Sequence, residues 1–179
     1  MVDSLASISS LKSLRLSSNL ITSSGYITIS NLLRSPNCSL TNLQLGNSNA
    51  RDNNVHVNDS VVASYMNALV DDNTLQTLTF GNYGHVSSIG RRWNPLINIL
   101  CNKTSITSIV NSNHTLHRVY SYYPKDRHGV SHELNAVLQM NENTNKVEVV
   151  RQKIIQYYFM DPLQQNKHHE YSQFKSYIT

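Results

Sequence analysis

The chain has 179 residues, of which 39% are hydrophobic and 15% charged, and its formal net charge at pH 7 is +4. That length suits one domain. No apolar run approaches the roughly 20 residues needed to cross a bilayer. The N-terminal sequence MVDSLASISSLKSLRL lacks a basic segment followed by a continuous apolar one. We therefore expect a cytoplasmic protein with no signal peptide and no membrane contact.

The basic residues are scattered along the chain, and Arg91 and Arg92 are the one adjacent pair. Nucleic-acid binding needs cations gathered on one face, so this composition makes a nucleic-acid partner an alternative rather than the main expectation. The two cysteines, Cys38 and Cys101, are too few to staple a small secreted fold. We expect both to be free, buried thiols.

A leucine pattern recurs from the start of the chain. Leu11, Leu14 and Leu16 form L-x-x-L-x-L, and the same pattern returns 29 residues later and again after a further 35. The later copies are Leu40, Leu43 and Leu45, and then Leu75, Leu78 and Phe80. Because side chains alternate along a strand, the last two apolar residues of each copy point to one face. Each copy therefore predicts a short strand.

Apolar residues three or four apart fill the stretches between these strands, as a helix with one buried face requires. The first such helix follows Gly25, the second has Asp59 or Ser60 as its N-cap, and the third has Pro95 in its first turn. The residues that carry the three patterns are Ile27, Ile29, Leu32 and Leu33, then Val61, Val62, Met66, Leu69 and Val70, and then Leu96, Ile97 and Leu100.

A fourth copy of the leucine pattern is degraded and has two candidates. One contains Ile106 and Ile109, and the other, ten residues further on, contains Leu116 and Val119. They are too close to be two full repeats, so one is the strand and the other an excursion. The pattern itself does not choose between them.

Two helices are expected after a tyrosine-rich loop at residues 120–130. Ser131 can cap the first, which carries Leu134, Val137 and Leu138. Residues 145–159 form the second, which ends at Asp161-Pro162. Its apolar residues are Val147, Val150, Ile154, Ile155, Tyr158 and Phe159.

The segments LKSLRLSSNLI with Gly25, LTNLQLGNSN and LQTLTFGN resemble the ribonuclease-inhibitor-like class of leucine-rich repeat proteins. The chain is also similar to uncharacterised microalgal proteins of this type, through LLRSPNCSLTNLQLGN and ILCNKTSITSIVNSNHTL. The resemblance implies an α/β fold, a right-handed solenoid with short parallel strands on the concave side and helices on the convex side. We expect the solenoid over residues 1–120, a helical C-terminal cap over 121–163 and a polar tail over 164–179.

The repeat also predicts which strand residues face outward on the concave side, as a candidate binding face. These residues are Ser13, Arg15, Ser17, Asn42, Gln44, Thr77 and Thr79. They are small, polar and nearly uncharged. Two interpretations stay open. Either a partner binds this face through many hydrogen bonds, or these are ordinary solvated residues and the partner binds elsewhere. Tyr120, Tyr122 and Tyr123 are a separate aromatic patch, either an anchor or a cover for the solenoid end.

No motif predicts chemistry. His128 and His132 have i,i+4 spacing, but Gly129 lies between them and the helix is expected to start at Ser131, so we expect no metal site. The chain has neither a G-x-S-x-G elbow nor a Gly-rich phosphate loop. We expect no enzyme activity, no cofactor and no small-molecule substrate.

The expected function is therefore a non-catalytic protein-interaction scaffold or structural repeat module with a protein partner. The alternative is a regulatory or nucleic-acid-binding module, including a GTPase-activator-like role. It predicts one shared basic face formed by Arg15, Arg91, Arg92, Lys103 and Arg118.

Two further features concern the edges of the molecule. Residues 49–58, NARDNNVHVN, lengthen the second repeat by a polar loop that serves as a binding edge or is merely tolerated. The N-terminus enters a repeat almost directly. Because a solenoid end exposes an apolar edge, that edge is minimally capped by Leu5 and Ile8, is covered by further repeats, or allows self-association.

Overall fold

The computed structural model describes residues 10–17, 19, 21–45, 59–80, 89–121 and 131–160. The predictions made for Leu5 and Ile8, for the 49–58 insertion, for Tyr122, Tyr123 and His128, and for the tail after Met160 lie outside these residues.

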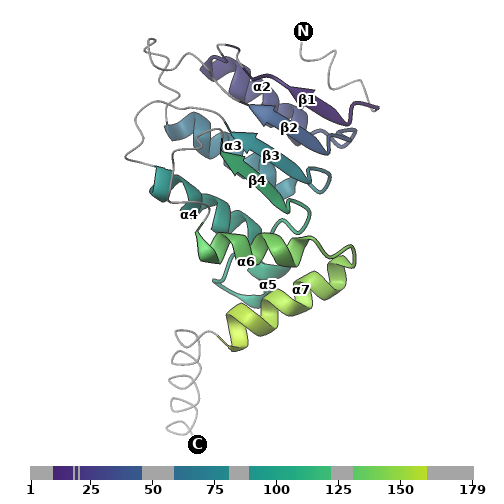
Figure 1. The fold of residues 1–179 in the computed structure, drawn as a ribbon, viewed down its shortest axis with the longest axis vertical. Helices are drawn as coiled ribbons and strands as arrows, with labels where there is room; N and C mark the ends of the chain where they lie inside the picture. Colours follow the sequence, from purple (N-terminus) through teal and green to yellow (C-terminus); the bar gives the residue numbers. More distant parts are fainter. Residues whose placement is uncertain are drawn as a thin grey trace, which may run out of the picture.

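Four short strands form one parallel sheet in which neighbours in the chain are neighbours in space. Figure 1 shows them descending through the molecule in chain order. The prediction of an α/β fold with short parallel strands is thus confirmed. The strands are β1 (Ser13–Arg15), β2 (Asn42–Leu45), β3 (Thr77–Phe80) and β4 (Arg118–Ser121).

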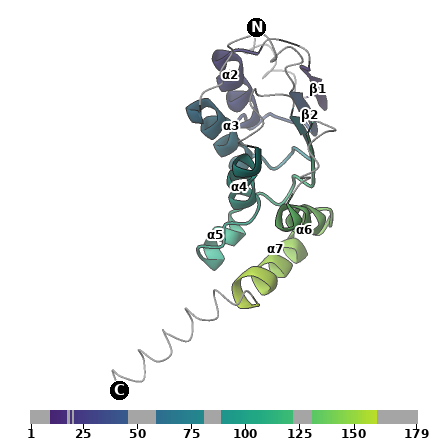
Figure 2. The same cartoon turned by 60° about the vertical axis from the view of Figure 1, so that its left-hand side comes forward.

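The helices that connect successive strands lie on one side of this sheet, as Figures 1 and 2 show. They are α2 (Ser23–Leu33), α3 (Asp59–Asp71) and α4 (Ile89–Leu100). Each packs on the next, α2 on α3 and α3 on α4, and α4 then packs on α6 (His132–Asn141). The short helix α5 (Ile106–Val110) lies between α4 and β4 in the chain. The last helix, α7 (Lys146–Ile154), continues into a π-helix, η2 (Ile155–Phe159).

The fourth strand contains Leu116-x-x-Val119, and the rival segment Ile106-x-x-Ile109 is helix α5. Apolar residues three apart suit a helical turn as well as the leucine pattern, and Ser105 decides in favour of the helix. Its hydroxyl accepts a hydrogen bond from the backbone N–H of Ser108, as an N-cap does. Ile109 is buried, whereas Ile106 and Val110 are exposed. The excursion therefore separates α4 from the strand of the next unit.

The three earlier helices form where the apolar spacing predicts them, but their starts differ from the prediction. Gly25 lies inside α2 rather than before it, because Thr22 supplies the N-cap oxygen to the Gly25 N–H. Helix α3 already includes Asp59 and Ser60, so neither precedes it. Pro95 lies in the interior of α4 rather than in its first turn. A proline there removes one helical hydrogen bond.

The core lies between the sheet and the helices and is built mainly from the repeat leucines. Leu43, Leu45, Leu75 and Leu78 are each at most 1% exposed. Leu11, Leu14 and Leu16 of the first copy pack against this core but are only partly buried. Burial of the pattern is therefore less complete at β1 than at β2 and β3.

Polar side chains connect each unit, meaning a strand with the turn before it and the helix after it, to the preceding one. The hydroxyls of Ser39, Thr74 and Thr115 donate to the backbone carbonyls of Leu11, Leu40 and Asn73, respectively. Each acceptor lies in the preceding unit. The hydroxyl just before β2, β3 and β4 therefore forms the same kind of hydrogen bond between neighbouring units. Such bonds satisfy backbone groups that the short strands leave open.

Helix α6 begins as predicted, with the Ser131 hydroxyl accepting from the Leu134 N–H, and it buries Leu134, Val137 and Leu138. The prediction for the following helix holds for Ile154 and Tyr158, which are partly buried and pack against the core, but it is wrong for three of its other residues. Val147 is 79% exposed, and Ile155 and Phe159 are also exposed. The inward residues recur at intervals of four and are Val149, Lys153 and Tyr157. The sequence pattern missed them because the middle member of this stripe is a lysine.

None of the helices within the described residues has the length and hydrophobicity that crossing a bilayer requires.

Candidate functional site

The register of the sheet aligns its outward residues in two rows across the four strands. Because neighbouring side chains on a strand alternate, both rows lie on the same face, opposite the buried leucines. The first row is Ser13, Asn42, Thr77 and Arg118, and the second is Arg15, Gln44, Thr79 and Tyr120. We call these eight residues the sheet face.

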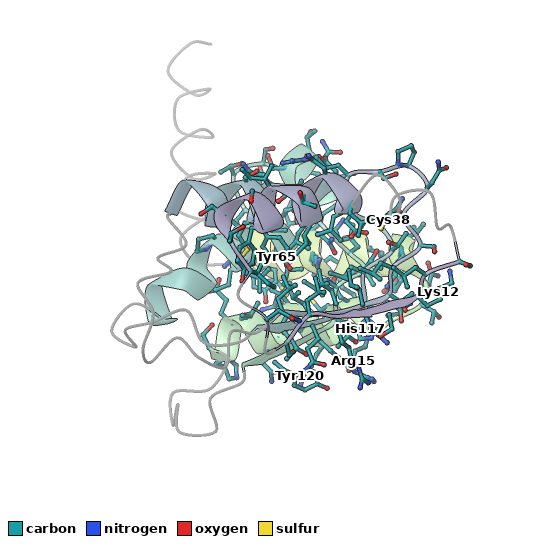
Figure 3. All side chains as sticks on the ribbon, turned by 90° about the horizontal axis from the view of Figure 1, so that it is seen from above. Lys12, Arg15, Cys38, Tyr65, His117 and Tyr120 are labelled. Carbon is teal, nitrogen blue, oxygen red and sulfur yellow. The ribbon has the colours of Figure 1, made fainter. Side chains whose placement is uncertain are left out.

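The sheet face surrounds a shallow hollow of about 250 Å³, and among the described residues that line it one, Leu43, is aliphatic. The view in Figure 3 has the helices on one side of the sheet, while Arg15 and Tyr120 project from the other. The labelled Tyr65, in contrast, lies between the two layers and is 2% exposed. The hollow is thus formed by the side of the sheet that α2, α3 and α4 leave uncovered.

Arg15 and Arg118 carry the charge of the sheet face, from β1 and β4 at its two ends. Neither guanidinium forms an ion pair or a hydrogen bond within the part of the chain that the structure describes. No Asp or Glu is among the described residues that line the hollow. Tyr120, on β4 with Arg118, is 52% exposed. The face therefore offers two cations, neutral hydrogen-bonding groups and one accessible aromatic ring.

Six of the seven predicted face residues line the hollow together, namely Ser13, Arg15, Asn42, Gln44, Thr77 and Thr79. Ser17 does not. Strand β1 ends at Arg15, and Ser17 lies in the turn beyond it with a buried hydroxyl oxygen that has no hydrogen-bond partner among the described residues. The alternation that projects Ser13 and Arg15 outward stops with the strand.

Arg118 and Tyr120 are not among the predicted face residues, because the leucine pattern does not choose between the two candidates for the fourth strand. A signal for that strand is present in the sequence. An Asn or Asp stands three residues before the first leucine of a copy, and a Ser or Thr stands one residue before it, in Asn37-Cys38-Ser39-Leu40, Asp72-Asn73-Thr74-Leu75 and Asn113-His114-Thr115-Leu116.

In two of these turns the side-chain oxygen of the Asp or Asn accepts from the backbone N–H groups two and three residues further along the chain. Asp72 accepts from Thr74 and Leu75, and Asn113 accepts from Thr115 and Leu116. This arrangement is an Asx-turn, which directs the chain into the next strand.

The basic residues of the alternative function are not all brought to the sheet face. Lys103 lies after α4, where its ammonium pairs with Glu133 at 2.5 Å and stacks 4.5 Å from the centre of the Tyr157 ring. Arg91 and Arg92 belong to α4, on the helical side of the sheet, and their side chains lie outside the described residues. Two of the five, Arg15 and Arg118, share the hollow.

A second polar cluster surrounds Lys153, which is fully buried at the C-terminal end of the molecule. Its ammonium lies 2.5 Å from the Leu100 carbonyl, 3.2 Å from the Asn113 carbonyl and 2.9 Å from His114 Nδ1. His114 Nε2 lies 3.1 Å from the Val110 carbonyl. An Nε2–H that donates to Val110 leaves Nδ1 free to accept from Lys153, so a neutral imidazole fits this network.

Burial governs the titration of this cluster. It lowers the pKa of Lys153 to about 7, an effect that nearby Lys146 adds to. Burial and the charge of Lys153 lower the pKa of His114 to about 4. Burial also raises the pKa of the Cys101 thiol. The cluster joins α7 to the end of α4 through the fully buried Lys153, which makes it an anchor for the last helix rather than an open site.

Cys38 and Cys101 are free, and Cys101 is buried while Cys38 is half-buried. Within the described ranges, no three His, Cys, Asp or Glu side chains gather as a metal site would require.

No protein-family model and no curated protein sequence matches this chain. Among solved structures, a chain described as "Leiomodin-1 Actin-Binding Site 2 (ABS2)" is similar to it, with a TM-score of 0.49 and 17% sequence identity. The alignment covers 96% of this chain and 77% of that one. Similarity at this level carries no argument about function, so the sheet face has to be interpreted from its own residues.

Proposed function

We propose that the protein is a non-catalytic interaction module of the leucine-rich repeat type and that it binds an extended segment of a partner protein on the sheet face. The observation that carries this proposal is the uncovered side of the parallel sheet, where residues from all four strands line one hollow. The opposite side is occupied by helices (Figure 2).

The character of the hollow supports a protein segment over a small molecule. Ligand pockets for small molecules are mostly apolar and enclose their ligand. This hollow is shallow and is lined mainly by hydroxyl, amide and guanidinium groups. Those groups can donate to and accept from a peptide backbone, and Tyr120 supplies the kind of aromatic contact that often dominates binding energy.

The repeat organisation is part of the same proposal. We infer a solenoid whose units each comprise a strand, a turn and a helix, and its support is the chain-order sheet together with the recurring bonds from one unit to the preceding one. Asn141 at the end of α6 donates to the Asn113 and Leu116 carbonyls, much as Asn113 donates to those of Leu69 and Asp72. We therefore assign α6 to the fourth unit and α7 to the cap.

An affinity capture with matched variants tests the function. The bait is the whole chain, and the face variant carries Asn42→Lys, Gln44→Lys and Thr77→Lys, three changes on partly or fully exposed strand positions. The control variant carries Asn31→Lys, Asn67→Lys and Asn98→Lys on exposed positions of α2, α3 and α4. The proposal expects specific proteins to be recovered by the native chain and the control but lost from the face variant. Equal recovery by all three baits contradicts it.

A further inference from the structure

The positions of the two arginines define a distance that a ligand has to span. Arg15 lies on β1 in the second row, and Arg118 lies on β4 in the first row. The two are therefore three strand spacings apart across the sheet and two residues apart along it. With neighbouring strands about 4.8 Å apart and a rise of about 3.3 Å per residue, their Cα atoms are separated by roughly 16 Å.

The charge of the hollow is one-sided. The nine described residues that line it include two arginines and no acid. The ion pairs found elsewhere among the described residues, Lys103 with Glu133 and Arg151 with Glu148, lie on or next to α6 and α7. Arg15 and Arg118 thus lack, among the residues that the structure describes, the carboxylate partner that those cations have, and a guanidinium binds a carboxylate by paired, charge-assisted hydrogen bonds.

The space between the two charges is neutral and polar. Asn42, Gln44, Thr77 and Thr79 lie in rows between the arginine strands. A duplex or single-stranded nucleic acid would present a charge at every nucleotide and needs several cations along its path. Two cations separated by neutral groups fit a polypeptide with two separated acidic side chains better.

We propose, resting on the proposed function, that the hollow binds an extended acidic segment whose two carboxylates are four residues apart, one on Arg15 and one on Arg118. Side chains of an extended chain alternate, so both acids point to the sheet only at an even spacing. Two acids four residues apart are separated by about 13 Å along an extended segment. The Cα atoms of the two arginines are roughly 16 Å apart, and their long side chains can lean toward each other to cover the difference. Tyr120 packs against an apolar residue of the segment two positions from one acid.

Direct titration with two synthetic peptides tests the spacing. Both are eight residues long and consist of Thr, Val and Ser with two Glu, at positions 2 and 6 in the first and at positions 2 and 5 in the second. They have the same composition and charge. Measured by fluorescence anisotropy with a neutral dye, the first peptide binds the whole chain about fivefold more tightly than the second, because only its acids reach both guanidinium groups. Equal binding of the two, or none by the first, overturns the proposal.

Variants at the arginines test the contacts. Arg15→Gln and Arg118→Gln should each weaken binding of the first peptide about threefold to tenfold. Arg151→Gln removes the same charge from an exposed position on α7 and should leave binding unchanged. In the double variant with Arg15→Glu and Arg118→Glu, a peptide with Lys at positions 2 and 6 should bind in place of the acidic one. Circular dichroism confirms that each variant is folded.

The outcomes also separate this inference from the proposed function. If the affinity capture depends on the sheet face but Arg15→Gln and Arg118→Gln leave peptide binding unchanged, the acidic segment is rejected and the interaction module stands. If the capture does not depend on the sheet face, the proposed function fails whatever the peptides do. A single-stranded oligonucleotide that displaces the first peptide at lower concentration than unlabelled peptide would assign the hollow to nucleic acid instead.

Discussion

Asn113 joins two units through one side chain that is 2% exposed. Its amide nitrogen donates to the carbonyls of Leu69 and Asp72 in the preceding unit, at 2.6 and 2.7 Å. Its amide oxygen accepts from the N–H groups of Thr115 and Leu116. Asn113→Ala would leave all four backbone groups without these partners in a buried place. We expect a loss of about 3 kcal/mol in the free energy of unfolding, measured by urea denaturation.

The matched control for this change is Asn102→Ala. Asn102 starts a similar turn, but among the described residues its side chain bonds to Thr104 alone, within the same turn. Its replacement should lower the free energy of unfolding by about 1 kcal/mol. Equal losses for the two variants would show that the bonds between units add nothing to the turn itself.

At the scale of elements, the first turn of α6 depends on one hydroxyl. Ser131 accepts from the Leu134 N–H at 3.2 Å, and Leu134 is fully buried. Ser131→Ala should lower the free energy of unfolding by about 1 kcal/mol. Ser131→Asn should retain most of the native stability, because Asn is an equally good N-cap. Thermal unfolding followed by circular dichroism gives the comparison. An alanine variant as stable as the native chain would show that the Ser131 cap does not contribute to stability.

Helix α7 is anchored by Lys153, and this anchor makes stability depend on pH. The pKa of Lys153 falls to about 7 in the folded protein from 10.5. Above pH 7 the unfolded chain therefore binds more protons at this site than the folded one, so stability rises with pH. Between pH 7.0 and 8.5 we expect a gain of about 1 to 2 kcal/mol in urea denaturation. This range stays below the ordinary pKa of the Cys101 thiol, which shifts the opposite way.

Lys153→Met provides the control, since methionine fills a similar space and carries no proton. Its free energy of unfolding should change much less over the same range. His114 acts in the same direction at lower pH, because its pKa of about 4 lies below the ordinary 6.5 and stability falls as the pH drops from 6.5 toward 4. A slope that survives unchanged in Lys153→Met would assign the effect to other groups.

How far the sequence predicts each element depends on whether its signal is local. The strands with intact leucine patterns and the helix capped by Ser131 are predictable, because alternation and a cap hydroxyl act within a few residues. The choice between Ile106 and Leu116 is not made by apolar spacing, which suits both. It depends on Ser105 as a cap and on Asn113 reaching carbonyls 41 and 44 residues away. The same choice decides whether Arg118 and Tyr120 join the sheet face.

At the scale of the whole molecule, protection of backbone amides against hydrogen exchange should increase from β1 to the central strands β2 and β3. Strands β2 and β3 are paired on both sides, and their leucines are essentially unexposed, whereas β1 pairs only with β2 among the described residues and its leucines are half-buried. Regions with fewer buried apolar contacts open at lower free energy. We expect amides of β1 to exchange with deuterium at least about tenfold faster than those of β3. Equal exchange in the two strands would indicate that the first unit is as firmly held as the third.

The turn at Asn113 has a consequence for how the protein can be produced. Asn113-His114-Thr115 has the Asn-x-Thr sequence that accepts N-linked sugars in a secretory pathway. A glycan on the amide nitrogen would replace a hydrogen that the fold donates to a carbonyl, at a side chain with no space for a sugar. Glycosylation of the unfolded chain would therefore block closure of the fourth unit. Thr115→Val abolishes this acceptor sequence and, among the described residues, removes one exposed hydrogen bond, to Asn73, so that a secreting host would leave the Asn113 side chain unmodified.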